Sequence, residues 1–361
     1  MVRSMSLLVA LSVSAPALAF GYGEAGAAKQ SLPERALHFH TDRLRVDPGA
    51  ADSTFDDLPA VRPLILADEL AAAARFYAED MAANGCFPAD HSSCDGTSFS
   101  ARVGSFYSSL PIGENIARGQ PTAEVAVFDS WLYSDGHRAN MLDADWNEIG
   151  TGHPVETPDD VWVQDFGGRA GSEEPIITSA IHAPLLAAPD DVITFFAAAY
   201  DPDGASLRGV TLVAEDACHF MDPDLGSDGM ETWAVDASVS AEAGCFKYWL
   251  AALRDNGEEV AFPTEGSLQV SVGDVTCEPW TSERTRAACA PPTFTGSGAG
   301  CGGSGAGYGP DANIGGNAEY GTCAVGTSAN RGSAATLLLA LFAGVRRRRQ
   351  ASGGSPRSSL T

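Results

Sequence analysis

The fold of this chain depends most on the segment Trp131-Leu132-Tyr133-Ser134-Asp135-Gly136-His137-Arg138-Ala139-Asn140-Met141-Leu142. One predicted helix ends in this segment and another begins there. The first helix starts at Pro121, with Thr122 as the expected N-cap. Its apolar face consists of Val125, Phe128, Trp131 and Leu132. Gly136 permits a left-handed turn that ends this helix. His137 then starts the next short helix and faces the same cleft as an earlier histidine.

Two further helices are predicted upstream of this segment. Residues 64–84 form a helix that Pro63 introduces and Gly85 ends. Its core stripe consists of Leu66, Leu70, Ala73, Tyr77 and Met81. Residues 33–46 predict an amphipathic helix, whose His38 and His40 we expect to be exposed or capped and to have no functional role.

Two short strands follow the segment, at residues 148–152 and 161–167. Successive residues of the second strand alternate between its two faces, which is typical of a half-buried strand. Helices that flank a small antiparallel sheet give an α+β arrangement, with the chemistry on the connecting loops.

Five motifs occur in an order that resembles one family. They are Phe87 to His91, Gly113-Glu114-Asn115-Ile116-Ala117, the segment 131–142, Ile149 to Gly152, and Trp162-Val163-Gln164-Asp165-Phe166-Gly167. Residues from about 36 to 168 resemble the CAP (SCP-like) superfamily, which includes cysteine-rich secretory proteins, antigen 5 and pathogenesis-related proteins. Within this superfamily, the motifs resemble those of the short bacterial branch. Two extra residues separate Phe87 from His91, and Met141 replaces an isoleucine. The resemblance implies an α-β-α sandwich over residues 33–169.

The resemblance also implies a central cleft in which two histidines and two acidic residues can bind a divalent metal. Carried over by position, these residues are His91, Glu114 and His137, whereas the second acidic position is Ser134 here. Two imidazoles, one carboxylate and a water satisfy tetrahedral zinc or another divalent cation. In the alternative, Glu114 and His137 hydrogen-bond each other and brace the loops, while Asn115 caps a turn.

Three functions remain open from the sequence. The resemblance implies a binding protein for a lipid, sterol, glycan or protein ligand of the cell envelope, and we favour a monomeric binding protein over an enzyme. The alternative is a secreted hydrolase of peptides or cell-wall material, with Glu114 as general base or with Ser134 and His137 as nucleophile and base. The chain has neither an HExxH nor a GxSxG motif. A purely structural surface protein is the third possibility.

Residues 174–273 predict a second domain, an all-β sandwich that resembles immunoglobulin-like modules. Its expected strands are 176–181, 192–200, 209–214, 233–239, 245–253 and 266–272, with turn signals at 201–204 and 256–257. Asp222, Asp224 and Asp228 have the spacing of calcium-loop ligands, but Trp233 stands where such a loop needs a glutamate. We interpret this stretch as a solvated acidic loop.

Both ends of the chain indicate export. Arg3, the apolar run 7–13 and Ala17-Leu18-Ala19 predict a signal peptide over residues 1–19, cleaved after Ala19. Residues 274–333 are interpreted as a linker rich in Cys, Gly and Ser. The apolar run 334–345 followed by arginines at 346–349 resembles a MYXO-CTERM sorting tail, and this run is shorter than the roughly 20 residues that span a bilayer. The protein is therefore expected to be secreted or attached to the cell surface.

The composition agrees with an exported globular protein. The chain of 361 residues is 44% hydrophobic and 19% charged, which suffices for two ordinary cores. Its net charge of -25 argues against a nucleic-acid partner. Eight cysteines in an exported chain favour disulfides. Proximity in sequence suggests the pairs Cys86–Cys94, Cys218–Cys245 and Cys277–Cys289, and leaves Cys301 and Cys323.

Overall fold

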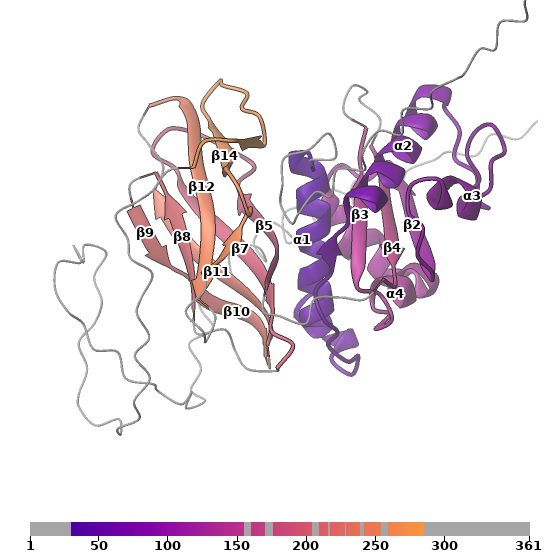
Figure 1. Ribbon diagram of the computed structural model, residues 1–361, viewed down its shortest axis with the longest axis horizontal. Coiled ribbons are helices and arrows are strands. Elements are labelled where there is room, and N and C mark those ends of the chain that lie inside the picture. The colour runs from indigo at the N-terminus through magenta and orange to yellow at the C-terminus, as the bar shows by residue number, and fades with distance from the viewer. Residues whose placement is uncertain are drawn as a thin grey trace, which may run out of the picture. The chain divides into compact units, whose positions relative to one another are not determined.

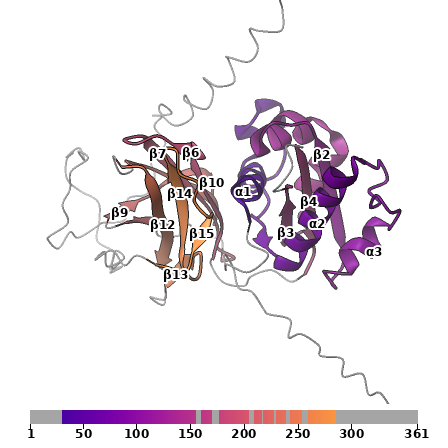
Figure 2. The ribbon, with the colours of Figure 1, turned by 90° about the horizontal axis from the view of Figure 1, so that it is seen from above.

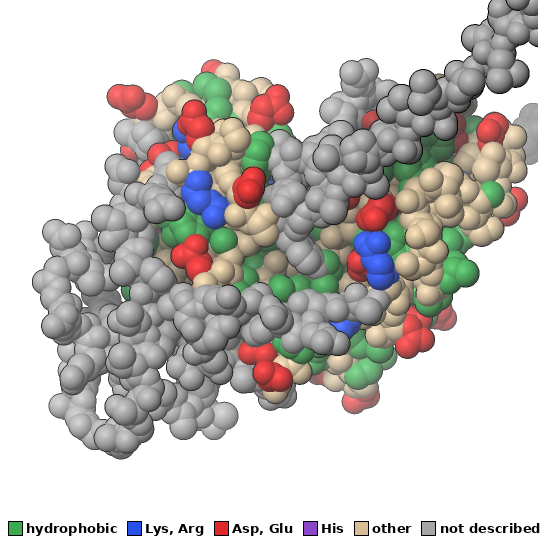
Figure 3. All heavy atoms as spheres, in the orientation of Figure 1, with side chains coloured by type: hydrophobic (Ala, Val, Ile, Leu, Met, Phe, Trp, Pro, Cys, Tyr) green, Lys and Arg blue, Asp and Glu red, His purple; other side chains and the backbone are tan. Residues whose placement is uncertain are grey.

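The structure is a computed structural model that describes residues 30–154, 160–169, 176–203, 209–215, 217–227, 229–238, 242–253 and 259–284. The predicted signal peptide, the sorting tail, Asp228, Cys289, Cys301 and Cys323 lie outside these residues. Within the described residues, no helix is both long enough and apolar enough to cross a membrane. On the face drawn in Figure 3, acidic side chains are spread among hydrophobic and uncharged ones.

Helices α1 and α2 begin and end at residues whose chemistry favours those positions. Helix α1 (Leu32–Val46) starts with a capping box, in which Ser31 and Glu34 satisfy each other's backbone N–H groups. Helix α2 (Asp68–Asn84) has two acidic residues in its first turn and ends at Gly85, which adopts the left-handed conformation with φ 64°. The prediction of a helix from residue 64 was wrong at its start, because Ile65 and Leu66 form strand β1.

A sheet in the order β1-β3-β4-β2 lies between these helices (Figures 1 and 2). Its strands are β1 (Ile65–Leu66), β2 (Ile112–Arg118), β3 (Glu148–Gly152) and β4 (Val161–Gly167). Gly150 faces the backbone of α2 at Leu70, whereas Thr151 points to the opposite side and donates to Glu34 O of α1 at 2.9 Å. Two helices on opposite faces of one sheet confirm the predicted α-β-α sandwich, and the two predicted strands, 148–152 and 161–167, have their expected bounds.

The segment around Trp131 does not form the single α-helix that the sequence predicts. A π-helical turn (Val125–Ser130) and a 3-10 turn (Trp131–Tyr133) precede helix α4 (Asp135–Met141). The chain turns at Ser134, whose ψ of 115° is extended, and Gly136 lies inside α4 without a positive φ. Trp131 is fully buried and its Nε1 donates to Ile116 O at 3.1 Å, so the change of winding keeps the indole in the core. The short helix α3 (Phe99–Gly104) was not predicted.

The described residues between 176 and 281 form two mainly antiparallel sheets that share one core. The first has the order β10-β11-β7-β5, with β5 (Ile176–Ala183), β7 (Val192–Tyr200), β10 (Asp222–Ser227) and β11 (Met230–Ser238). The second has the path β15-β14-β12-β8-β9, with β8 (Val210–Ala214), β9 (Ala217–Phe220), β12 (Gly244–Leu253), β14 (Ser267–Val272) and β15 (Trp280–Thr281). Strand β13 (Glu259–Phe262) pairs with β12, and β6 (Leu186–Ala187) pairs with β14. Phe195 and Trp233 of one sheet meet Leu212 and Tyr248 of the other, which confirms the β-sandwich.

Two local predictions in this region were wrong. Asp222 and Asp224 lie in the edge strand β10 and not in a loop, because this stretch pairs antiparallel with β11. Charged side chains on an edge strand stay solvated and discourage pairing with another chain. Strand β15 falls in the expected linker, since Trp280 pairs with Leu268 of β14. The exact domain limits 33–169 and 174–273 stay predictions.

The disulfides correct two of the three predicted pairs. Cys86–Cys94 is confirmed, but Cys245 is bonded to Cys277, so the pairs Cys218–Cys245 and Cys277–Cys289 were wrong. The sheet explains the difference: Cys245 lies opposite Ser271 in the β12–β14 ladder, and the Cys277 N–H donates to Ser271 Oγ at 3.0 Å. Cys218, on β9, is also disulfide-bonded. Closeness in sequence was therefore a poor guide to closeness in the sheet.

Helix α1 packs against strands of the β-sandwich as well as against β3. Phe39 of α1 shares a hydrophobic core with Ile181 of β5 and Phe196 of β7. His38 and His40 were expected to be exposed or capped, but neither is exposed, and His40 is half-buried. His38 is buried and its Nε2 lies 2.8 Å from Leu64 O, while burial, followed by the charge of Arg43, lowers the pKa of His40 to about 3.

Candidate functional site

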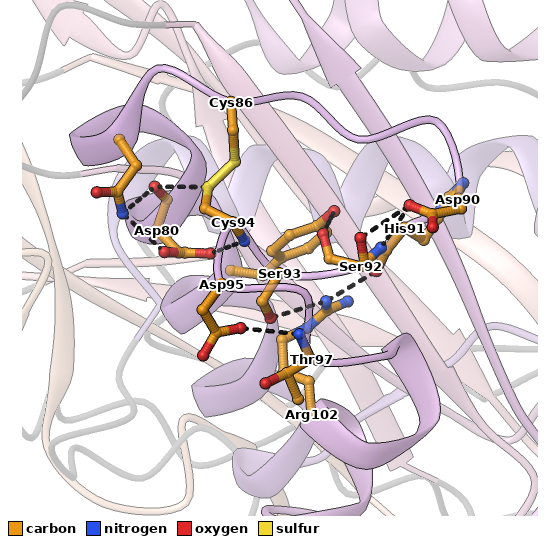
Figure 4. Close-up of a disulfide and its surroundings, with 12 residues drawn as sticks. Asp80, Cys86, Asp90, His91, Ser92, Ser93, Cys94, Asp95, Thr97 and Arg102 are labelled. Atoms are coloured by element: carbon orange, nitrogen blue, oxygen red, sulfur yellow. Dashed lines mark hydrogen bonds between the residues drawn. A yellow bond between two sulfur atoms is a disulfide. The ribbon is translucent and has the colours of Figure 1, made fainter.

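His91 lies on the loop that connects α2 with α3, between the two cysteines of the first disulfide (Figure 4). Its Nδ1 is 2.8 Å from Oε1 of Glu114 on β2. A carboxylate can only accept, so in neutral His91 the proton is on Nδ1 and the Nε2 lone pair is free. The imidazole is 29% exposed whereas the Glu114 side chain is 1% exposed. Glu114 thus orients a histidine whose other nitrogen is open to a ligand.

Arg102 of α3 is a member of this cluster that the sequence did not reveal. Its Nη2 donates to Glu114 Oε2, and its Nη1 donates to the carbonyl oxygen of His91 at 2.9 Å. The guanidinium is 1% exposed and its central carbon lies 3.5 Å from the centroid of the Tyr77 ring. Arg102 belongs to none of the five motifs, and only the packing of α3 brings it to Glu114. It compensates the negative charge of the buried carboxylate.

Asp165 of β4 is the second residue that sequence reasoning missed. It is the direct cross-strand neighbour of Glu114, is fully buried, and no N–H group donates to either of its carboxyl oxygens. Burial, followed by the charge of Glu114, raises the pKa of Asp165 well above its ordinary value. The raised pKa favours the protonated form of Asp165 beside Glu114. Its only sequence signal was its place in the Trp162–Gly167 motif.

Glu114 accordingly accepts hydrogen bonds from His91 and Arg102, and Asp165 lies opposite it on β4. Its oxygens are occupied and its charge is balanced, so Glu114 is poorly suited to act as a general base or as a direct metal ligand. Within the described residues, the ligand atoms of His91, Glu114 and His137 do not gather within 4.8 Å of one another. The hydrogen bond between Glu114 and His137, expected in the bracing alternative, is also absent among the described contacts of Glu114.

His137 of α4 has a polar partner of its own. Its Nδ1 is 2.8 Å from Ser134 Oγ, at the turn just before the helix. When the proton is on Nδ1 it is donated to Ser134, and Nε2 is free. Burial lowers the pKa of the half-buried His137, and the nearby His91 lowers it further. The two imidazoles are therefore close enough to repel each other as cations.

A chain of buried amides supports this arrangement from behind. Asn115 Nδ2 donates to His137 O at 3.2 Å and to Gln164 Oε1 at 3.0 Å. Asn140 Nδ2 donates to Glu114 O and to Asn115 Oδ1, each at 3.1 Å. Asn115 therefore links β2 to α4, and it does so from within the sheet and not by capping a turn with its side chain.

The donors present fit a divalent cation through imidazole alone. His91 and His137 each have Nδ1 engaged by a partner, and this leaves Nε2 of both to coordinate. Hydrogen bonding of Nδ1 to a carboxylate or a hydroxyl is the usual support for a metal-binding histidine. The predicted metal-binding set of His91, Glu114 and His137 stays a prediction.

Comparison with known families places this fold. The family model described as "Cysteine-rich secretory protein family" (CAP) matches residues 59–166, which include strands β1 to β4 and the His91, Glu114 and His137 cluster. These residues form a CAP domain. The CAP domain thus carries every residue of the candidate site.

Individual relatives resemble only this part of the chain. The uncharacterized protein YkwD of Bacillus subtilis is 36% identical over 110 residues, which are 30% of this chain and 41% of that protein. An outer surface protein of Borrelia burgdorferi is 23% identical with a TM-score of 0.30, covering 37% of this chain and 90% of that one. An extracellular protein with an SCP domain from Bacillus anthracis is 24% identical with a TM-score of 0.29, covering 37% of this chain and 40% of that one.

Proposed function

We propose that this protein is an extracellular CAP-domain binding protein whose cleft takes up a divalent cation through Nε2 of His91 and Nε2 of His137. The carrying observation is that His91 and His137 are both half-buried with Nδ1 hydrogen-bonded, and that the charge of His91 acts on His137. Glu114 orients His91 and does not coordinate. Two disulfides and the family's secretory character support an extracellular location.

Zinc is the cation that this donor set favours, since imidazole nitrogen suits zinc and two ligands leave two tetrahedral positions open. Water or an oxygen atom of a ligand completes the coordination. The cation thereby gives a strongly acidic protein a local positive charge with which to hold a lipid, sterol, glycan or protein ligand of the cell envelope.

One contact favours a hydrolase as the second candidate. Ser134 Oγ is 2.8 Å from His137 Nδ1, so a hydroxyl and an imidazole base are in hydrogen-bond reach. However, His137 has no carboxylate among its described contacts to orient it, and Glu114 is engaged by Arg102. Both features weaken the hydrolase relative to the binding protein.

Zinc titration of the full exported chain by calorimetry tests the proposal, with elemental mass spectrometry for stoichiometry. We expect one zinc per chain, and loss of binding in both His91→Ala and His137→Ala. The control is His219→Ala, which removes a half-buried histidine of the β-sandwich and is expected to bind like the wild type. Absence of zinc binding by the wild type, or equal binding by the His91 and His137 variants, would overturn the proposal.

The variant Ser134→Ala separates the two candidate functions. A hydrolase that uses Ser134 loses its activity on peptide or cell-wall substrates in this variant. Under the binding proposal Ser134→Ala still takes up zinc, with at most a tenfold to hundredfold loss of affinity because Nδ1 of His137 loses its partner.

A further inference from the structure

We propose that the disulfide Cys86–Cys94 is a redox-controlled latch, which holds His91 in the cation-binding position and releases the cation when a dithiol reduces it. The inference rests on the proposed function, because it concerns the same pair of imidazoles. Its basis is geometric: the disulfide closes the loop on which His91 lies, and the two arms of that loop are held very differently (Figure 4).

The arm that follows His91 is fixed to the body of the protein by several hydrogen bonds. Tyr77 Oη donates to Ser92 O at 3.0 Å, and the Cys94 N–H donates to Asp80 Oδ2 at 2.8 Å. Ser93 is buried, and its N–H donates to Thr97 O at 2.8 Å. These bonds do not depend on the disulfide.

The arm that precedes His91 packs against a hydrophobic cluster through Cys86, but within the described residues it has no hydrogen bond to the body of the protein. The described hydrogen bonds of residues 87–90 stay within the loop: the His91 N–H donates to Pro88 O, and Ser92 donates to Asp90 Oδ1. Phe87 is 42% exposed. Among the described contacts, the sulfur–sulfur bond is the covalent link between the start of this loop and its end, in addition to the hydrogen bond from the Cys94 N–H to Asp80 of α2.

The backbone of His91 needs such a restraint. Its φ of 61° lies in the left-handed region, which is uncommon for residues other than glycine, although histidine adopts it more often than most. Arg102 Nη1 holds the carbonyl side of His91, at 2.9 Å, and the disulfide restrains the side that leads into it. With the disulfide open, the loop can return to an ordinary φ. That movement turns the imidazole away from Glu114.

The chemistry of release is a thiol–disulfide exchange. A thiolate of an external dithiol attacks one sulfur of Cys86–Cys94 and forms a mixed disulfide, and its second thiolate then displaces the protein sulfur. Two electrons and two protons reach the protein as two thiols, and the dithiol becomes a disulfide. Both cysteines are only half-buried, although Cys86 packs against a hydrophobic cluster, and their partial exposure allows this attack.

The test compares two double variants of the full chain. Cys86→Ser/Cys94→Ser opens the latch, and Cys245→Ser/Cys277→Ser opens a disulfide of the β-sandwich as the matched control. Serine is preferred to chemical reduction, because free thiols at Cys86 and Cys94 would lie within 4.8 Å of the Asp80 carboxylate and bind zinc themselves. The readouts are zinc affinity by calorimetry, the nitrogen-15 NMR signals of the imidazoles, and the thermal midpoint.

For Cys86→Ser/Cys94→Ser, the latch predicts at least a tenfold fall in zinc affinity and loss of the hydrogen-bonded Nδ1 proton of His91. For the control variant, both the zinc affinity and the His91 signal are expected to stay unchanged. Unchanged affinity and an unchanged His91 signal in a folded latch variant overturn the proposal. If the wild type binds no zinc, the proposed function fails, but the NMR signal of His91 still decides whether the disulfide positions it.

A second measurement covers the case in which the latch variant does not fold. The wild-type chain is reduced stepwise with a dithiol, alkylated, and mapped by mass spectrometry, while the NMR signal of His91 is followed. We expect that signal to shift in step with alkylation of Cys86 and Cys94. A shift that follows Cys245 and Cys277 instead contradicts the latch.

Discussion

At the scale of single residues, the candidate site depends on how the charges around Glu114 are balanced. Arg102 supplies one positive charge, and the pKa of Asp165 is raised well above its ordinary value, which favours its uncharged form. Two ionised carboxylates side by side in a buried sheet are strongly unfavourable, so the protein neutralises the one that is completely enclosed. The cluster is thus close to neutral, and this leaves the imidazoles as its exposed ligands.

Replacing Asp165 by asparagine tests this balance. A group whose pKa is raised on folding adds stability below its unfolded pKa, near 3.9, and that contribution is lost as the pH rises through the folded value. The amide of Asp165→Asn donates to Glu114 at every pH, so this variant should lose less stability between pH 4 and 8. At pH 7 we expect it to be more stable than the wild type by about 1 kcal/mol or more.

The measurement is urea unfolding of both proteins across this pH range. Asp165→Ala serves as the control, because it cannot donate to Glu114 and is expected to be destabilised at all pH values. Stability curves of Asp165→Asn and the wild type that run parallel from pH 4 to 8 would show that Asp165 is ionised in the folded protein.

At the scale of elements, the two glycines of strand β3 set the distance between the sheet and α2. A Cβ on Gly150 would lie 2.0 Å from the Leu70 carbonyl carbon, and one on Gly152 would lie 2.2 Å from that of Ala74. Backbone atoms of a packed helix cannot move aside as a side chain does. The Ile149–Gly152 motif is therefore explained by close packing of a helix on a strand.

Gly150→Ala is expected to destabilise the protein by about 3 kcal/mol, at the upper end of what overpacking costs. Gly104→Ala is the matched control: Gly104 ends α3, has open space around its Cβ position and no positive φ, so alanine there should be neutral or stabilise by up to about 1 kcal/mol. Thermal unfolding of both variants measures the difference. A Gly150→Ala protein with the thermal midpoint of the wild type contradicts the close-packing explanation.

At the scale of the whole molecule, Asp42 connects the CAP domain to the β-sandwich. Its Oδ1 accepts from the Leu64 N–H at 2.7 Å, and its Oδ2 accepts from Thr178 Oγ1 at 2.9 Å and from Ser179 Oγ at 2.7 Å. All of these side chains are buried. Since α1 also shares its core with β5 and β7, the β-sandwich is part of the structural support of α1.

We expect Asp42→Ala to cost about 3 kcal/mol, because it leaves several buried donors without an acceptor. The control is Glu283→Ala, which removes a 72% exposed partner of Lys247 and should leave the thermal midpoint unchanged. Calorimetry of the full chain gives both values. Equal melting of Asp42→Ala and Glu283→Ala would show that the Asp42 hydrogen bonds do not hold the two parts together.

The sequence by itself determined the family, the α-β-α sandwich, the strands 148–152 and 161–167, the β-sandwich and the candidate histidines. Each of these depends on local patterns or ordered motifs. The tertiary structure alone decided the Cys245–Cys277 pairing, the burial of His38, and the partners of Glu114. Arg102 contacts Glu114 from helix α3, and Asp165 lies opposite Glu114 on the neighbouring strand β4. Such contacts depend on the register and packing of distant segments, and no spacing along the chain encodes them.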